Sequence, residues 1–395
     1  MNGDILAKVF EFVDKEELTA FLQKAIQIPS HIECLDQEKE VAEFIAQKMM
    51  AVGIETELQI VEGKRPNVIS TIRGDRNGKS ITFNGHIDSI PPFDMTEPFS
   101  GRIDGDTMYG RGTSDMKSGI IAMAYAMIAI KRSGYKPPGD VVLSAMVGEE
   151  YGSFGATHYV KHSKLTDYGV CGEPTGLKIA TAQKGLHWFE FNVPGRRIHS
   201  SVSSQGINAL KRLNQLMTLI NEKLEPSLKK RTHHLLGSSL VNLGKAWGGE
   251  QPNVVPGEAH LQIERRYIPG ETLKSVMVEL DEIVAECNKG YDGYPISYES
   301  MPYSLLVTKT PMDIPVEHPI VQGMLAAGKS VLGEQPDIFG APFWGDAGVL
   351  SDAGVTTLLF GPGEVSDAHT ANEHVSLENV FKAAKIYAAL PFLLG

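Results

Sequence analysis

The sequence predicts an α/β protein into which a smaller α+β domain is inserted. Predicted strands alternate with predicted helices over about the first 180 residues, and several apolar stretches end at a histidine or a carboxylate. Such alternation is typical of a largely parallel sheet covered by helices. Between residues 184 and 307 the order becomes β-α-β-β-α-β, a split βαβ unit of ferredoxin-like type that can fold by itself.

The first part of the sheet domain is placed at residues 1–183. Residues 15–52 are predicted to be helical, and 38–50 carries apolar side chains on one side. The stretch 119–132 is apolar around its whole circumference, which predicts a buried helix. Strands are predicted at 55–61, 67–73, 80–84 and 139–147.

The inserted domain is placed at residues 184–307, after which the chain returns to the sheet domain at 308–395. The predicted elements of the insertion are 187–193, 208–224, 239–244, 259–267, 273–286 and 296–306. The returning part is predicted to contain a helix at 320–331, a buried strand at 355–360 and a final helix at 379–394.

Composition excludes several classes of protein. The net charge of −11, from 48 acidic and 37 basic residues, argues against a nucleic-acid partner, because phosphate binding needs clustered cations. No stretch approaches the roughly 18 apolar residues of a membrane span. Three scattered cysteines argue against a disulfide framework, and no signal peptide is visible, so we expect a cytoplasmic protein without a membrane partner.

Histidines and carboxylates stand at or near the ends of apolar stretches or in the turns between them. They are His86, Asp88, Asp115, Glu149, Glu150, Glu173 and His369. The strand ends of an α/β sheet open on a crevice where ligands bind. Two imidazoles and three or four carboxylates converging there would hold two divalent ions, which predicts a metallohydrolase. Nitrogen and oxygen donors without thiolate fit Zn²⁺, and Co²⁺ or Mn²⁺ could substitute.

Taken singly, each of these residues also has a structural interpretation. His86 could lie in a surface turn, although Asp88 is placed to fix its tautomer. Asp115 precedes the buried helix and could cap it or bridge two metals. Glu149 and Glu150 could be solvated, or one could bind a metal while the other faces a water that the metals activate.

Five motifs resemble those of the zinc-dependent family of aminoacylases, acetylornithine deacetylases, succinyl-diaminopimelate desuccinylases and glutamate carboxypeptidases. They are Gly85-His86-Ile87-Asp88, Gly110-Arg111-Gly112 with Asp115-Met116-Lys117, Gly148-Glu149-Glu150, Gly172-Glu173-Pro174-Thr175, and Ala368-His369-Thr370 with Glu373. The resemblance extends over essentially the whole chain. It implies a zinc-exopeptidase-like catalytic domain that carries an inserted lid.

The resemblance also assigns ligands. Asp115 would bridge two metal ions, with His86 and Glu173 on one ion and Glu150 and His369 on the other.

Further roles follow from the same resemblance. Glu149 would be the general base, and Asp88 would orient a ligand histidine. The family also implies a cis peptide bond between Asp115 and Met116.

In the inserted domain, the segment around His199 resembles the one whose histidine reaches the partner's active site and polarises the scissile carbonyl. This implies a homodimer formed through the lids. Asn253 and Arg266 match the segments that hold the substrate carboxylate, and Arg266 fits better than Arg265 by its distance from Pro269-Gly270. Arg266 could instead belong to a salt bridge within the lid.

One segment departs from the family pattern. The loop 89–99 is shorter than in many relatives and lacks their tryptophan. Because this loop borders the site in relatives, the departure weakens any inference about substrate.

The sequence thus predicts a dinuclear metal-dependent amidohydrolase that cleaves an N-acyl amino acid or a related small carboxylate. A metallo-exopeptidase, either a dipeptidase or a glutamate-type carboxypeptidase, would use the same centre and is the alternative. A non-catalytic binding protein would require a missing ligand or base, and none is missing. A zinc-stabilised structural protein is disfavoured because structural zinc prefers closed thiolate sites.

Overall fold

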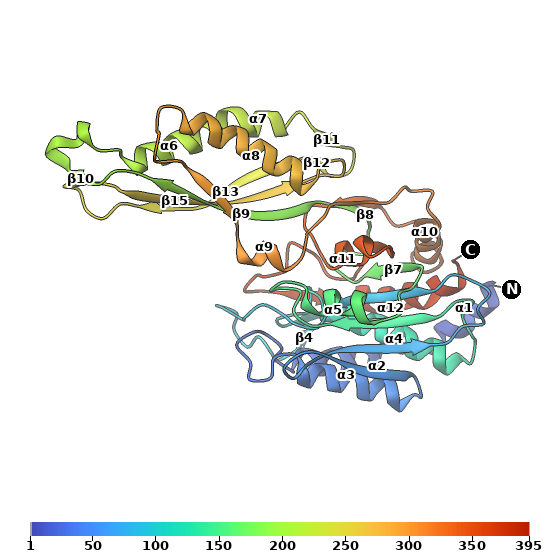
Figure 1. Cartoon of the computed structure of the whole chain (residues 1–395). Helices are drawn as coiled ribbons and strands as arrows, with labels where there is room; N and C mark the ends of the chain where they lie inside the picture. The colour runs from blue at the N-terminus through green and yellow to red at the C-terminus, as the bar shows by residue number, and fades with distance from the viewer. Residues whose placement is uncertain (1, 395) are drawn as a thin grey trace. The chain divides into compact units, whose positions relative to one another are not determined.

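The computed structural model describes residues 2–394, which form two compact units (Figure 1). Unit 1 contains the chain up to Ala182, Asp313–Ala341 and the residues from Gly345 onward, and unit 2 contains Gln183–Met312 with Pro342–Trp344. Unit 2 thus extends a few residues beyond the predicted insertion. Among residues 2–394, no helix is both long enough and apolar enough to cross a membrane.

A nine-stranded mixed sheet is the centre of unit 1. Its main path runs in the order β1-β2-β6-β3-β7-β19-β8-β17, and β18 pairs with β8. The strands are β1 (Glu55–Glu62), β2 (Arg65–Ile72), β3 (Ile81–His86), β6 (Val141–Met146), β7 (Tyr168–Cys171), β8 (Ile179–Gln183), β17 (Met312–Asp313), β18 (Ile338–Ala341) and β19 (Thr356–Leu359).

Four neighbouring strands of this sheet are parallel. β3 pairs with β6 and with β7, and β7 pairs with β19, in parallel register. Every residue of β3 and β6 is buried, as expected for strands covered on both faces. The carboxyl ends of these strands therefore share one edge of the sheet, with His86 opposite Met146.

Helices cover both faces of the sheet. Within unit 1, α3 and α4 pack on one face, while α5 and α11 pack on the other (Figure 1). The buried helix that the sequence predicts is α4, in which residues 117–130 are all buried, and it ends at Gly134 with a left-handed φ of 76°.

The helices of unit 1 are α1 (Asn2–Phe10), α2 (Lys15–Ile26), α3 (Lys39–Ala51), α4 (Lys117–Ser133), α5 (Phe154–His162), α10 (Pro319–Leu332), α11 (Ala347–Asp352), α12 (Leu377–Ala389) and the 3-10 helix η3 (Leu390–Phe392). A small separate sheet contains β4 (Arg102–Asp104), β5 (Thr107–Tyr109) and β20 (His374–Ser376).

Unit 2 has the predicted β-α-β-β-α-β order. Its elements are β9 (Gly185–Pro194), α6 (Ala209–Leu219), β13 (Leu240–Gly248), β15 (Glu258–Tyr267), α8 (Leu273–Asn288) and β16 (Ser297–Ser300). The antiparallel sheet runs β13-β15-β9-β16, and α6 and α8 cover one of its faces (Figure 1). Apolar side chains of the strands and of both helices, including Phe189, Leu213, Leu261 and Leu280, form the core of this unit.

Shorter elements complete unit 2. They are the ribbon β10 (Ile198–His199) with β14 (Val254–Val255), the 3-10 helix η1 (Ser200–Gln205), the π-helical turn η2 (Ile220–Leu224), α7 (Glu225–Leu228), and the pair β11 (Thr232–His233) and β12 (Gly237–Ser238). The predicted strand 296–306 is wrong in its second half, because the strand ends at Ser300 and α9 (Pro302–Leu306) follows. Pro302 lies in the first turn of α9, where a missing N–H costs nothing.

Candidate metal centre

Asp115 stands between two histidines that are far apart in the sequence. Its Oδ1 lies 3.1 Å from Nε2 of His86, and its Oδ2 lies 3.1 Å from Nε2 of His369. His86 ends β3, Asp115 lies in the turn before α4, and His369 lies in the loop before β20. Two oxygens that face two different imidazoles are suited to bridging a pair of cations.

Glu150 joins the same cluster from the turn that follows β6. Its Oε1 lies 3.1 Å from Nε2 of His369, and one ligand atom from each of His86, Asp115 and Glu150 lies within 4.8 Å of the others. Hydrogen bonds to Asp115 and Glu150 raise the pKa of His369 to about 10. The centre therefore favours positive charge at this place, as a cation-binding site must.

Two further carboxylates, Glu149 and Glu173, have too little positive charge around them to offset the cost of burying their ionised form. Burial raises the pKa of Glu149 well above its ordinary value, although His86 acts in the opposite direction. Burial also raises the pKa of Glu173, and the negative charge of Asp115 adds to the shift. Carboxylates clustered in this way are stabilised in their ionised form by divalent cations, so the donor set fits a metal site.

Asp88 holds the turn that carries the two glutamates. Its Oδ1 accepts the backbone N–H of Glu149 at 3.2 Å, and its Oδ2 accepts that of Glu150 at 3.1 Å. Nδ1 of His86 lies 3.1 Å from the carbonyl oxygen of Asp88 and 3.5 Å from the carboxylate. The backbone carbonyl is thus the nearer partner of the His86 ring, and the carboxylate mainly positions Glu149 and Glu150. The peptide bond between Asp115 and Met116 is cis, as the resemblance implied.

Two residues at this centre, Gly345 and Asp346, are not among the predicted site residues. Gly345 lies so close to Glu173 that a Cβ added to it would be 2.8 Å from Oε1 of that glutamate. The neighbouring Asp346 is buried, and its charge contributes to the raised pKa of both Glu149 and Glu173. Asp346 is separated from β18, a strand of only four residues, by Pro342–Trp344 and Gly345, so the strand-end context that marks the other residues does not mark it.

The three residues predicted in the inserted domain belong to unit 2. His199 pairs with Val254 across the β10–β14 ribbon, and the N–H of Ser200 donates to the carbonyl of Asn253 at 3.0 Å, so His199 and Asn253 are neighbours. Arg266 forms an ion pair with Glu264 at 2.6 Å and donates to the carbonyl of Pro342 at 3.2 Å. Arg266 thus does form a salt bridge within unit 2.

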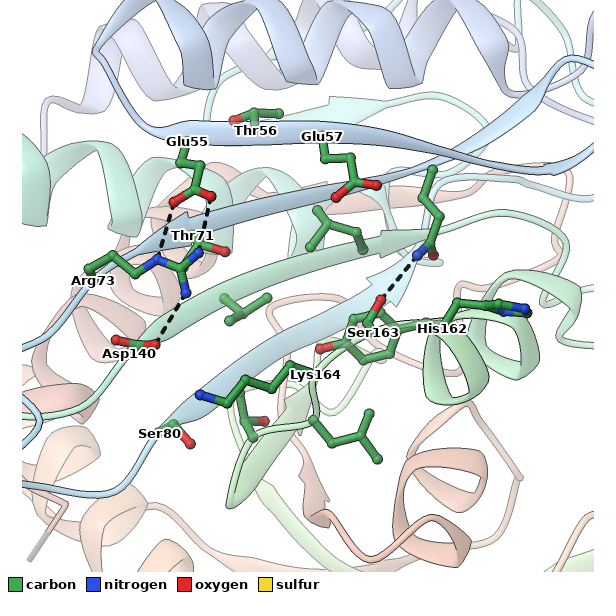
Figure 2. Close-up of a pocket in the computed structure, with 16 residues that line it drawn as sticks. Glu55, Thr56, Glu57, Thr71, Arg73, Ser80, Asp140, His162, Ser163 and Lys164 are labelled. Carbon is green, nitrogen blue, oxygen red and sulfur yellow. Dashed lines mark hydrogen bonds and ion pairs between the residues drawn. The ribbon is translucent and has the colours of Figure 1, made fainter.

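A hollow of about 380 Å³ in unit 1 lies beside the strands β1, β2 and β6 and contains none of the predicted ligands (Figure 2). Figure 2 shows the Arg73 guanidinium between Glu55 and Asp140, at distances of 3.0 Å and 3.4 Å. The charges of Arg73, Glu55 and Asp140 are thus already paired within this hollow.

Comparison with known proteins identifies a family pattern. The pattern described as "Peptidase family M20/M25/M40" matches residues 82–392.

Two relatives align over most of their length. An N-formyl-4-amino-5-aminomethyl-2-methylpyrimidine deformylase of Halalkalibacterium halodurans is 25% identical, over 96% of this chain and 95% of the relative. An acetylornithine deacetylase of Aliivibrio fischeri is 27% identical, over 89% and 91%. Among solved structures, aminopeptidase PepT from Bacillus cereus has the same fold, with a TM-score of 0.79 and 20% identity over 97% of this chain and 99% of that chain.

Proposed function

Because the chain belongs to peptidase family M20/M25/M40, whose members are metal-dependent hydrolases of amide or peptide bonds, we propose that it is a deacylase. Its substrate would be an N-acyl amino acid or a related small carboxylate. The observation that carries this proposal is the position of Asp115 between His86 and His369. The choice of an acyl substrate is supported by two nearly full-length relatives, a deformylase and a deacetylase.

We propose two divalent ions per chain, most simply Zn²⁺, with Co²⁺ or Mn²⁺ as substitutes. Asp115 would be shared between the ions, His86 and Glu173 would hold one, and Glu150 and His369 would hold the other. When bound, such ions polarise the scissile carbonyl and lower the pKa of a water molecule.

The remaining chemistry falls to the side chains of the chain itself. Glu149 takes a proton from the attacking water and passes it to the leaving amine. Its burial and the neighbouring carboxylates, which raise its pKa, suit a group that must hold a proton between two steps. Asp88 fixes Glu149 through the backbone N–H bond at 3.2 Å.

His199 would stabilise the oxyanion of a partner subunit in a homodimer formed through unit 2. The backbone N–H of Ser201 donates to Nδ1 of His199 at 3.2 Å. Because a backbone N–H can only donate, Nδ1 acts as acceptor there, and a neutral ring then carries its proton on Nε2. That tautomer presents the N–H donor that an oxyanion requires.

Two residues of unit 2 would hold the substrate carboxylate, namely Asn253 and Arg266. For Arg266 this role requires the guanidinium to serve both Glu264 and the substrate, and an arginine with five N–H donors can do so. The three cysteines are free, which is consistent with a reducing compartment, and we propose the cytoplasm.

The test is a panel of N-formyl, N-acetyl and N-succinyl amino acids together with dipeptides, assayed with chelator-stripped enzyme reloaded with each metal. Metal-dependent turnover restricted to one acyl class would support the deacylase. Turnover of dipeptides alone would establish the alternative, a metallo-exopeptidase with the same centre. A chain that binds two metals but hydrolyses none of these compounds would contradict both assignments.

A further inference from the structure

Glu373 is a buried carboxylate in the loop that follows His369. Its Oε1 accepts the backbone N–H groups of Gly112, Ser114 and Asp115 at 3.0, 2.9 and 3.0 Å. Its Oε2 forms an ion pair with Arg111 at 2.6 Å, and the exposed fractions of the two side chains are 0% and 1%. A charge-assisted network of this kind fixes the course of the turn that carries Asp115.

The same contacts join the loops of two predicted metal ligands. Glu373 lies four residues after His369, and its own carbonyl accepts the N–H of Gly110 at 3.1 Å. The glycine-rich turn before Asp115 is therefore held at both ends by one residue of the His369 loop. The hydroxyl of Ser114 also donates to the carbonyl of Glu364 at 2.7 Å, and neither loop contains regular structure at the ligand itself, so these contacts constrain Asp115 relative to His369.

Arg111 extends the network to a third segment, the loop 89–99. Its backbone N–H donates to the carbonyl of Pro98 at 2.8 Å, and its Nη2 donates to the carbonyl of Pro92 at 3.4 Å. These two carbonyls lie near the two ends of the loop that follows Asp88. A single guanidinium thus connects this loop, through Glu373, to the backbone of Asp115.

From these contacts we infer that Arg111 and Glu373 form a positioning unit, which sets the geometry of Asp115 relative to His369 and holds the loop 89–99 against the metal centre. The inference rests on the proposed function in that Asp115 and His369 are taken as metal ligands. Neither Arg111 nor Glu373 touches the reacting atoms. Their effect is exerted through the groups that they hold.

The first experiment compares Glu373→Gln with Glu271→Gln. Glu271 is a buried carboxylate of unit 2 that pairs with Arg231 at 2.7 Å and accepts the N–H of Ile268 at 2.9 Å, so it matches Glu373 in chemistry but lies in the other unit. A glutamine at position 373 must turn an NH₂ group either toward three N–H donors or toward Arg111. We expect zinc and cobalt affinity, measured by competition with a chromophoric chelator, to fall about tenfold or more in Glu373→Gln.

Glu271→Gln should lower the melting temperature without changing metal affinity. Wild-type affinity in Glu373→Gln, or an equal loss in both variants, would overturn the inference.

Hydrogen exchange of the metal-free proteins provides a second readout, which is independent of substrate and of metal. Residues 89–99 and 110–115 should both exchange faster in Glu373→Gln and in Arg111→Lys than in Glu271→Gln. Unchanged exchange in these two segments would refute the coupling, even if the proposed substrate class proved wrong.

Discussion

Glu38 and Arg65 form a bidentate ion pair, with Oε1 2.6 Å from Nη2 and Oε2 2.7 Å from Nε. The side chains are 2% and 14% exposed. The guanidinium also lies against Gly148, where an added Cβ would be 2.8 Å from Nη2. The ion pair therefore packs against Gly148, the residue that directly precedes Glu149 and Glu150.

Removing one member of this pair should be more damaging than removing both. Glu38→Met leaves the largely buried guanidinium paired with the exposed Glu62 at 3.3 Å, so the loss should be smaller than the value of about 3–5 kcal/mol typical of a buried charge left unpaired, whereas an apolar replacement of both partners is often neutral. We expect the double variant Glu38→Met/Arg65→Met to unfold at a higher temperature than Glu38→Met alone. Thermal unfolding followed by circular dichroism measures this. Glu11→Gln, in an exposed pair with Lys8, is the control and should leave the melting temperature unchanged.

Replacing the proposed general base should separate catalysis from metal binding. Glu149→Gln removes the proton acceptor, and we expect kcat to fall by about 10²–10⁴. Because the ligands that we propose are other residues, two metals per chain should still be found by atomic emission after gel filtration. If metal content falls together with activity, Glu149 is a ligand instead.

The missed residue Gly345 offers a test of Glu173. In Gly345→Ala the new methyl group would be 2.8 Å from Oε1 of Glu173, closer than real contacts allow, so the carboxylate must move. We expect metal affinity to fall about tenfold while the fold is retained. Gly3→Ala, where an added methyl meets nothing within 4 Å, is the matched control and should bind metal like the wild type. Unaltered metal affinity in Gly345→Ala would argue against Glu173 as a ligand.

Much of this centre was predictable because parallel strands deliver their carboxyl-terminal residues to one edge. His86 is the last residue of the buried strand β3, and Glu149 and Glu173 follow the buried strands β6 and β7, so all three fit the strand-end pattern. Asp346 does not fit this pattern, because β18 has only four residues and the segment Pro342–Trp344 lies between that strand and Asp346.

Other features depend on contacts that a sequence does not display. The carboxylate of Asp88 accepts two backbone N–H groups. Nearly every residue has such a group, so the sequence does not show which of them a carboxylate will bind. The helix α5 lies outside the predicted elements, and it contains Gly155, a residue that disfavours helix. That glycine is required because a Cβ there would lie 2.5 Å from both Asn67 and Val147.

The proposed role of His199 in trans predicts complementation between two inactive variants. Glu149→Gln and His199→Ala should each be nearly inactive, yet a mixture that exchanges subunits should regain activity. In a mixed dimer, the chain with intact Glu149 receives His199 from its partner, so one site of two is complete. With equal amounts and random exchange, about a quarter of wild-type activity is expected, since half of the dimers are mixed. No recovery despite proven exchange would show that His199 does not act across the dimer.

Acid should destabilise unit 2 through His187. This side chain is 2% exposed, its Nε2 lies 2.8 Å from the hydroxyl of Ser300, and burial, followed by the charge of Lys309, lowers its pKa from 6.5 to about 4. Between pH 6.5 and 4 the unfolded chain binds a proton that the folded chain does not. Stability is therefore complete above pH 6.5 and is lost as the pH falls toward 4, by roughly 3 kcal/mol if the whole shift is expressed. His187→Gln should flatten the dependence of the melting temperature on pH in this window, whereas His162→Gln, at an exposed site, should not. Equal slopes for His187→Gln and the wild type would show that protonation of His187 is not what destabilises the protein in acid.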